Sequence, residues 1–208
     1  MRRKKIPEDF YYIMMNKKSG EVCSTVSDSH ETVYSRFPQN ILLSNGAKLH
    51  SAGRLDCDTE GLLIFTNDGK LSNFLTRPEN RIAKKYFVRL KLPVSKEGQK
   101  EYKERAEKGL ILPPEKKAAE QNSSGSTIEW ISETECHITL TEGKFHEVKR
   151  IFLALGNEVA FLKRVEFAGL ELDEKLAPGE WRFLTQDELG RITKDSPLRC
   201  EQSLSFRT

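Results

Sequence analysis

The chain has 208 residues, 37% of them hydrophobic, and a formal net charge of +3 from 34 basic and 31 acidic side chains. No apolar run approaches the roughly 20 residues of a membrane span, which excludes a membrane-spanning protein and predicts one large or two small domains with a real core. The near balance of charge neither requires nor excludes a polyanionic partner.

The four cysteines exclude two classes of site. They lie far apart and form no C-x-x-C pair, so neither a zinc ribbon nor a dithiol redox motif is supported. Unclustered thiols are typical of a reducing compartment, and the N-terminus lacks the apolar segment of a signal peptide. We therefore expect a cytoplasmic protein.

Basic residues are concentrated in two places. Residues 1–9 begin with MRRKK and are expected to form a basic N-terminal tail, while residues 77–105 contain ten Lys or Arg and four Glu. Such clustering suits contacts with phosphates, although a solvated charged face is the commoner meaning of a run of charges.

The first third of the chain predicts short strands and turns. Phe10–Asn16 is apolar and predicts a buried strand, ending in a turn at Gly20, and residues 21–25 predict a short second strand. Residues 27–37 offer Ser and Asp caps for a brief helix before Pro38, and residues 47–51 predict a further strand.

The middle of the chain alternates helices and strands. A turn at residues 67–69 precedes a helix that stops near Pro78, because three apolar residues fall on one helical face. Residues 86–92 alternate as a strand does, and residues 96–108 predict a charged, peripheral helix ended by glycine.

The last third predicts a hairpin and two helices. TIEWIS (127–132) and CHITLTEG (136–143) read as a hairpin of two strands around the loop EQNSSGST (120–127). An amphipathic helix is expected over residues 145–155, followed by a final strand at 159–167.

A capping box at residues 185–188 opens a short helix, and residues 190–208 are expected to form a C-terminal tail. The mixture of hairpin-like strands and interspersed helices predicts an α+β fold, with one domain spanning residues 10–189.

The stretch SAGRLDCDTEGLLIFTNDG (51–69) places charges at alternate positions beside an apolar run. Asp56, Asp58, Glu60 and the following glycine match the first half of an EF-hand loop. The twelfth position, which should be a glutamate, is Asn67, and LLIFT reads as a strand, so a calcium site is not expected.

A polar turn and a catalytic carboxylate remain as interpretations of the same stretch. Asp, Thr and Gly are ordinary turn residues. If the segment is extended, however, Arg54 and Asp56 project from one side while Leu55 points into the core. A carboxylate beside a guanidinium stays ionised and oriented, as a nucleophile or general base requires.

A second group of candidates lies in EGKFHEVKRIF (142–152). On a helical wheel with Phe145 at zero, Lys149 falls at about 40°, on the margin of the buried face, and Arg150 at about 140°, opposite it. Lys149 can therefore better reach a partly buried carboxylate. His146 is either a phosphate contact or a surface histidine, and no histidine spacing predicts a metal site.

A third candidate is the aromatic residue of AKKYFVRL (83–90). Tyr86 follows Lys84 and Lys85 at the start of a predicted strand. It is either an ordinary core aromatic or a ring that stacks on a nucleobase while the lysines contact phosphates.

Together these segments resemble one family. GRLDCDTEGLLIFTNDG, KKYFV, EGKFHEVKRIFLALGN and LAPGEWRFLT, in this order, are similar to the RsuA/RluB/RluE/RluF group of ribosomal RNA pseudouridine synthases. The likeness runs from about residue 10 to 189. It implies a catalytic domain with a central, mostly antiparallel mixed sheet, flanking helices and an RNA-binding cleft.

The resemblance also implies roles for individual residues. Asp56 would be the catalytic aspartate with Arg54 beside it, Tyr86 would pack against the target base, and Lys149 would be the basic partner of Asp56. RNA contacts are expected from the remaining basic residues of the motifs: Lys84, Lys85, Lys144, His146 and Arg150. No metal or organic cofactor is implied, and the expected partner of this monomer is ribosomal RNA or a pre-ribosomal particle.

The sequence departs from the family pattern in three places. Only about 50 residues precede the GRLD motif, so the N-terminal RNA-binding domain of many members is expected to be absent. Lys18 stands where proline is usual, and GKFHE replaces the commoner G-R-x-H-Q, which puts substrate contacts at Lys144 and Glu147 in doubt. Two alternatives stay open: a synthase acting on transfer RNA, and a non-catalytic RNA-binding ribosome-assembly factor.

Overall fold

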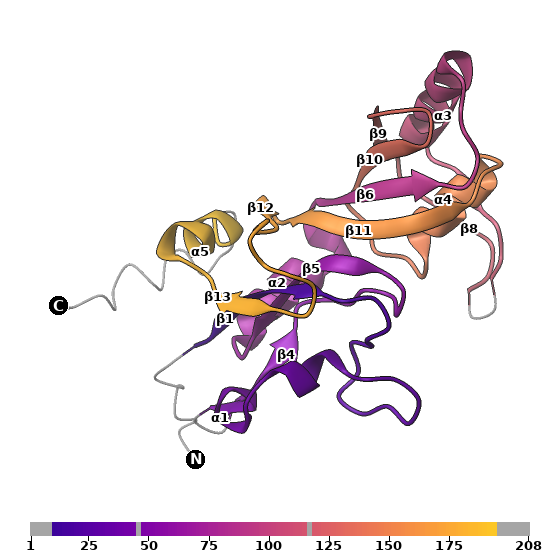
Figure 1. Cartoon of the computed structure of the whole chain (residues 1–208). Helices are drawn as coiled ribbons and strands as arrows, with labels where there is room; N and C mark the ends of the chain where they lie inside the picture. Colours follow the sequence, from indigo (N-terminus) through magenta and orange to yellow (C-terminus); the bar gives the residue numbers. More distant parts are fainter. Residues whose placement is uncertain (1–9, 45–46, 116–117, 195–208) are drawn as a thin grey trace. The chain divides into compact units, whose positions relative to one another are not determined.

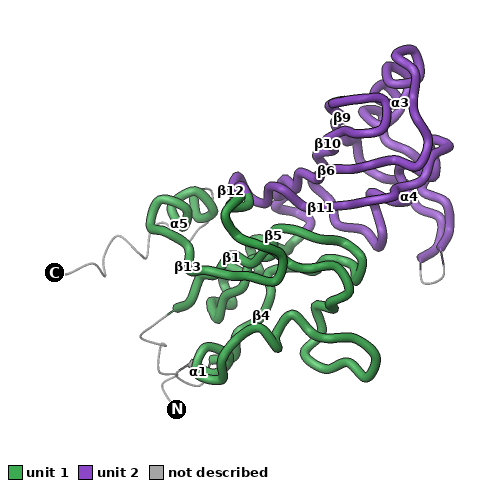
Figure 2. Tube along the Cα trace, viewed as in Figure 1, with its two compact units in different colours: residues 1–77, 172–208 green, residues 78–171 purple. Residues whose placement is uncertain are grey.

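The computed structural model describes residues 10–44, 47–115 and 118–194 (Figure 1). The chain divides into two compact units: residues 1–77 with 172–208, and residues 78–171 (Figure 2). The predicted domain of residues 10–189 is thus built as two units. The predicted tail at 1–9 and most of that at 190–208 lie outside the described residues.

Unit 1 is organised around one central strand. β1 (Tyr12–Lys17) pairs antiparallel with β5 (Glu60–Thr66) on one side and β13 (Trp181–Phe183) on the other. β4 (His50–Ser51) also pairs antiparallel with β5, His50 with Thr66 and Ser51 with Phe65. The last five residues of β1 and the last six of β5 are buried, because both faces of these strands are covered. This burial explains the uninterrupted apolar runs in the sequence.

Short helices complete unit 1. Asp68 caps α2 (Gly69–Thr76), its Oδ1 accepting hydrogen bonds from the backbone N–H groups of Lys70 and Leu71. The helix stops before Pro78, as predicted. The remaining elements are a 3-10 turn (Val33–Arg36), α1 (Gln39–Leu42), the hairpin of β2 (Leu43–Ser44) and β3 (Ala47–Lys48), and α5 (Gln186–Ile192) with its predicted capping box.

Three predictions for unit 1 need correction. The strand expected at 21–25 is a single bridge between Val22 and Thr32. The helix expected at 27–37 is only the 3-10 turn, since Thr32 supplies no side-chain cap. α5 runs three residues into the predicted C-terminal tail.

Unit 2 is a layer of antiparallel strands in the order β11-β6-β10-β9. These strands are β6 (Lys84–Leu90), β9 (Thr127–Trp130), β10 (Glu135–Leu140) and β11 (Val159–Phe167), with β12 (Leu170–Glu171) folded back on β11. Burial alternates along β6 and β10, so one face of the layer forms the core and the other is open to water.

Helices cover the core face of unit 2. α3 (Lys96–Lys108) packs on β9, where Trp130 Nε1 donates a hydrogen bond to the Gln99 carbonyl, and α4 (Glu147–Ala154) packs against β11 and β7. The small elements are a 3-10 turn (Pro78–Asn80), β7 (Ile111–Leu112) and β8 (Gln121–Asn122).

The predicted hairpin is correct, but its loop is not. β9 and β10 are joined by residues 131–134, whereas the segment EQNSSGST precedes the hairpin and contributes β8. Gly125 in this segment lets two backbone stretches cross closely, because a Cβ at this position would lie 2.3 Å from the Glu107 carbonyl oxygen.

Helices and strands are interspersed along the chain, and the α+β prediction is confirmed. Within the described ranges, no helix is long and apolar enough to cross a membrane.

Candidate active site

The loop between β4 and β5 presents Arg54 and Asp56, as the sequence predicts. Leu55 is 7% exposed and packs into the core, whereas Arg54 is exposed and Asp56 is half-buried. The backbone N–H of Thr59 donates to the Asp56 carbonyl at 3.1 Å, which closes a turn directly after the aspartate. The chain therefore holds the Asp56 carboxyl at the edge of the core of unit 1.

A buried lysine, Lys17, holds this loop in place as a brace, a role that its local sequence does not predict. Lys17 is fully buried at the end of β1, and its Nζ donates to the carbonyls of Lys18, Cys57 and Thr59 at 3.0, 3.1 and 2.8 Å. The backbone N–H of Gly20 also donates to the Cys57 carbonyl, at 2.8 Å. Burial lowers the pKa of Lys17. The ammonium group thus fixes the backbone on the C-terminal side of Asp56.

No local pattern predicts this role for Lys17, because its position in the sequence reads as part of the polar turn after β1. Cys23 adds a further tie, because its Sγ accepts from the Leu55 N–H at 3.4 Å. Long-range contacts of β1 and its following loop thus position the candidate catalytic segment.

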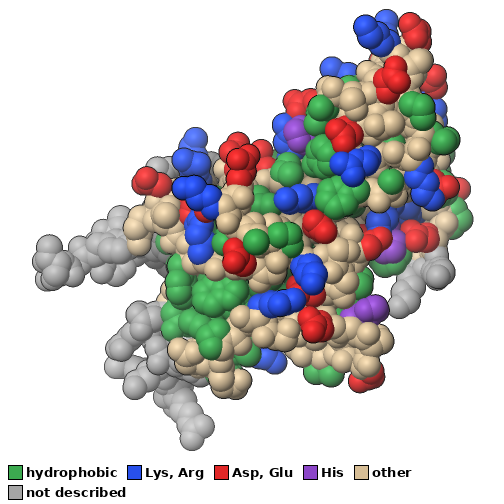
Figure 3. All heavy atoms as spheres, viewed as in Figure 1, with side chains coloured by type: hydrophobic (Ala, Val, Ile, Leu, Met, Phe, Trp, Pro, Cys, Tyr) green, Lys and Arg blue, Asp and Glu red, His purple; other side chains and the backbone are tan. Residues whose placement is uncertain are grey.

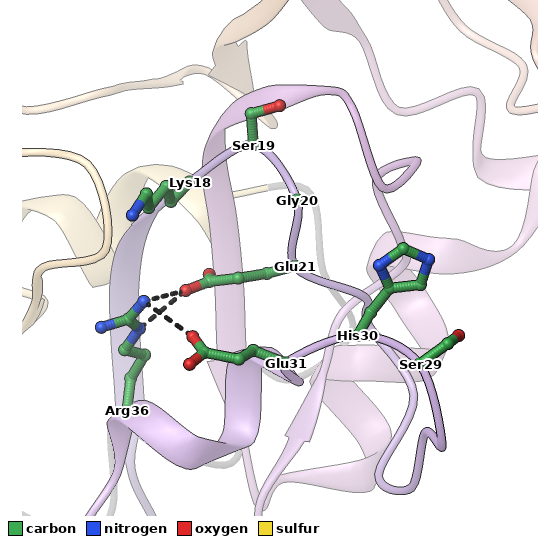
Figure 4. Close-up of a pocket in the computed structure, with 8 residues that line it drawn as sticks. All are labelled: Lys18, Ser19, Gly20, Glu21, Ser29, His30, Glu31 and Arg36. Atoms are coloured by element: carbon green, nitrogen blue, oxygen red, sulfur yellow. Dashed lines mark hydrogen bonds and ion pairs between the residues drawn. The ribbon is translucent and has the colours of Figure 1, made fainter.

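A small pocket of about 230 Å³ lies beside this brace (Figure 4). It is lined by Lys18, Ser19, Gly20, Glu21, Ser29, His30, Glu31 and Arg36. Arg36 forms ion pairs with Glu21 and Glu31, so carboxylates offset the cationic groups. The pocket is smaller than typical organic cofactor sites, and its balanced charge suits a structural ion-pair cluster.

In unit 2, strand β6 places the two lysines that precede Tyr86 on opposite faces of the sheet. Lys84 and Tyr86 lie on the core face, and Tyr86 is 8% exposed. Burial and the nearby Arg164 lower the pKa of Lys84 to about 8, while Glu147 opposes the shift. Lys85 lies on the other face, where it pairs with Glu129 at 2.7 Å. Only Lys84 therefore shares the face of Tyr86.

α4 begins at Glu147, two residues after Phe145, the residue at which the expected helix starts. His146 is its N-cap residue and adopts a left-handed conformation with φ of 48°, and Phe145 lies outside the helix with 37% exposure. His146 Nδ1 lies 2.8 Å from Glu115 Oε1, and the Lys144 ammonium pairs with Glu142. Both predicted RNA contacts thus already have carboxylate partners.

The prediction for Arg150 is wrong. Its side chain is 1% exposed, not on the face opposite the core. The guanidinium donates to four backbone carbonyls, at 2.8 to 3.3 Å, those of Leu112, Pro113, Ala119 and Phe145. The β7–β8 segment covers this side of α4, so Arg150 holds the segment together and is unsuited to contact RNA. Lys149 is half-buried, on the margin that the wheel predicts.

Glu147, at which the resemblance left a substrate contact in doubt, is a buried carboxyl group. It is 6% exposed, its Oε2 accepts from the Lys144 N–H at 3.0 Å, and burial raises its pKa to about 7. Because the folded state then holds the proton more tightly than the unfolded chain, the free energy of unfolding falls as pH rises from about 4.5 to about 7.

Glu147→Gln should therefore stabilise the protein at pH 8 but not at pH 5. We expect a gain of roughly 2 kcal/mol at pH 8, or about 4–8 °C in Tm, measured by thermal unfolding at both values. Glu142→Gln is the control. The bonds from Lys144 and Ser124 outweigh burial and lower the pKa of Glu142 to about 2, so its loss should lower Tm at both pH values. Equal Tm changes for Glu147→Gln at pH 5 and 8 would contradict the assignment.

The predicted site residues are divided between the two units. Arg54 and Asp56 belong to unit 1, and Tyr86, Lys84 and Lys149 to unit 2. The partnership of Asp56 with Lys149 stays a prediction of the resemblance. Within the parts of the chain that the structure describes, no group of three or more His, Cys, Asp or Glu side chains could hold a metal ion.

Comparisons with known proteins agree with the motif resemblance. The model of the RNA pseudouridylate synthase family matches residues 11–154. The ribosomal small subunit pseudouridine synthase A of Escherichia coli K12 is 39% identical over 181 residues, covering 87% of this chain and 73% of that protein. The Vibrio cholerae protein of the same name is 42% identical, covering 88% and 74%.

Solved structures show the same fold. A crystal structure of a pseudouridylate synthase matches with a TM-score of 0.78 and 38% identity, over 89% of this chain and 74% of that one. A chain of an archaeal box H/ACA complex matches with a TM-score of 0.55 and 18% identity, over 81% and 51%, and shows the shared fold alone.

Proposed function

The chain belongs to the RNA pseudouridylate synthase family, and on that premise we propose that it converts a specific uridine of small-subunit ribosomal RNA into pseudouridine, with Asp56 as the catalytic carboxylate. The family is established by the match over residues 11–154, and the RNA is suggested by the names of relatives about 40% identical over most of the chain. The observation that supports Asp56 is the braced loop, in which Leu55 and Lys17 hold the backbone on either side of it.

The reaction needs a carboxylate and no change of oxidation state. The bond between uracil N1 and ribose C1′ breaks, the base turns, and C5 bonds to C1′; the C5 hydrogen leaves as a proton and N1 gains one. Asp56 would act either as a nucleophile at C1′ or as a base at C2′. Neither route requires a metal or an organic cofactor.

The other site residues would bind and position the uridine. A uridine in folded RNA must be flipped out of its stack, and exposed Arg54 is suited to fill its place or to grip the backbone. Tyr86 would hold the detached base by stacking. Lys149 would keep Asp56 anionic. Of Lys84 and Lys85, Lys84 is the one suited to contact this nucleotide, because it lies on the same face of the sheet as Tyr86.

Two measurements test this function: turnover of the purified protein on labelled RNA, and a map of pseudouridines in cells with and without the gene. Wild-type protein should release tritium from small-subunit RNA transcripts labelled at uridine C5, and a cell lacking the gene should lose one pseudouridine in that RNA. If the cell instead loses a pseudouridine in a transfer RNA, the substrate is transfer RNA and the proposed ribosomal RNA substrate is wrong. Absence of both tritium release and any change in the map would identify a non-catalytic RNA-binding protein. We further expect it to act in the cytoplasm, as a monomer, on free RNA or a pre-ribosomal particle.

A further inference from the structure

The outer face of the unit 2 sheet, opposite Tyr86, carries aromatic and basic side chains. The strand register places Phe87 between Lys163 of β11 and His137 of β10, and Arg89 beside Phe161. Directly paired residues project from the same face of a sheet. We define this outer face by Lys85, Phe87, Arg89, His137, Phe161 and Lys163. Glu129 and Glu135 lie on the same face and pair with Lys85 and Arg89, so Lys163 is the cation of this set for which no carboxylate partner is described.

Three rings of the outer face lie on three adjacent strands. The centroid of Phe87 is 6.1 Å from that of Phe161 and 6.0 Å from that of His137, with interplanar angles of 62° and 70°. All three side chains are half-buried, although the core of the unit lies on the other face. The rings thus form a continuous aromatic row that water reaches.

Cations flank these rings. The Arg89 guanidinium lies 5.7 Å from the centre of Phe161 and is held by Glu135 at 2.9 Å. Lys163 stands directly across from Phe87. Burial and the neighbouring Lys85 lower the pKa of His137, while Glu129 opposes the shift, and the net effect favours the neutral ring. Figure 3 shows hydrophobic, basic, acidic and histidine side chains interspersed over this part of the molecule.

We infer that the outer face is an RNA-binding surface, on which bases of a single-stranded segment of the substrate stack against Phe87, Phe161 and His137. Single-strand binding proteins combine aromatic platforms for bases with cations along the backbone. A protein partner fits less well, since charged residues are depleted at the centre of protein interfaces and here charged side chains alternate with the rings. The inference rests on the proposed action on RNA and adds a surface on the face of the sheet opposite Tyr86.

Binding of a fluorescein-labelled oligouridylate to the full chain, followed by anisotropy, tests this surface. Phe87→Leu with Phe161→Leu keeps apolar bulk but removes the π-faces, and should raise Kd at least about tenfold. Lys163→Ala should reduce the slope of log K against log salt by about one. Leu92→Ala and Ile131→Ala, at exposed apolar positions outside this face, should bind within about twofold of wild type.

Photo-crosslinking of wild-type protein to 5-bromouridine RNA is an independent measurement that does not depend on variants. Crosslinked peptides should map to β6 and β11 around Phe87 and Phe161. Wild-type affinity in the double variant, or crosslinks confined to other segments, would overturn the inference. Binding requires no turnover, so an enzyme that forms no pseudouridine would refute the proposed function alone, and an active enzyme with unchanged binding in the variants would refute the surface alone.

Discussion

Asp56→Asn should abolish pseudouridine formation while RNA binding persists. The amide has nearly the same shape as the carboxylate but is neither a nucleophile nor a base at neutral pH, so we expect a rate loss of at least about 10³-fold. The loop should keep its conformation, because Leu55 still packs into the core and Lys17 still binds the Cys57 and Thr59 carbonyls. Tritium release from C5-labelled small-subunit RNA measures the rate.

The same loop offers a matched control. Asp58 is an exposed carboxylate two residues later, and Asp58→Asn removes the same charge from the same segment. It should retain most activity, and both variants should bind the transcript with similar affinity. Substantial turnover by Asp56→Asn, or a much greater loss in Asp58→Asn, would show that the catalytic carboxylate lies elsewhere.

Arg150→Met should strongly destabilise the fold. Methionine leaves four carbonyl oxygens of the β7–β8 and α4 region without their donor in a site that is almost fully buried. An unsatisfied buried acceptor costs about 1–3 kcal/mol, and partial relaxation makes a total of about 3 kcal/mol reasonable. For a chain of this length the loss corresponds to roughly 6–12 °C in Tm, measured by thermal unfolding.

Lys149→Met is the control on the same helix, since it introduces the same side chain at a half-buried position. We expect a small change in Tm together with a lower rate of tritium release, because Lys149 is the proposed partner of Asp56. The reverse pattern, with Lys149→Met unfolding early and Arg150→Met stable, would contradict both assignments.

Much of this arrangement follows from local sequence. Alternating burial along β6, the buried Leu55 between Arg54 and Asp56, and the cap and stop of α2 all follow from side-chain periodicity and turn chemistry, which act over a few residues. The motifs around Asp56, Tyr86 and Lys149 carried the family resemblance before any coordinates, and the family was then confirmed by the comparisons.

The errors share a different cause. The wheel failed at Arg150 because it assumed one buried face, whereas β7 and the segment that follows it cover α4 on another side. The strand predicted at 21–25 is only a bridge, because among the described residues its pairing does not continue beyond Val22 and Thr32. Long-range packing, which a local pattern does not contain, decided both.

The sequence by itself determined the α+β class, the motif residues and the family. The tertiary structure decided which charged side chains are structural: Lys17 and Arg150 are buried because carbonyls distant in sequence satisfy their donors. It also separated Lys84 from Lys85 onto opposite faces of one sheet. A buried cation is tolerated only where its hydrogen bonds are satisfied, and those partners come together only when the chain folds.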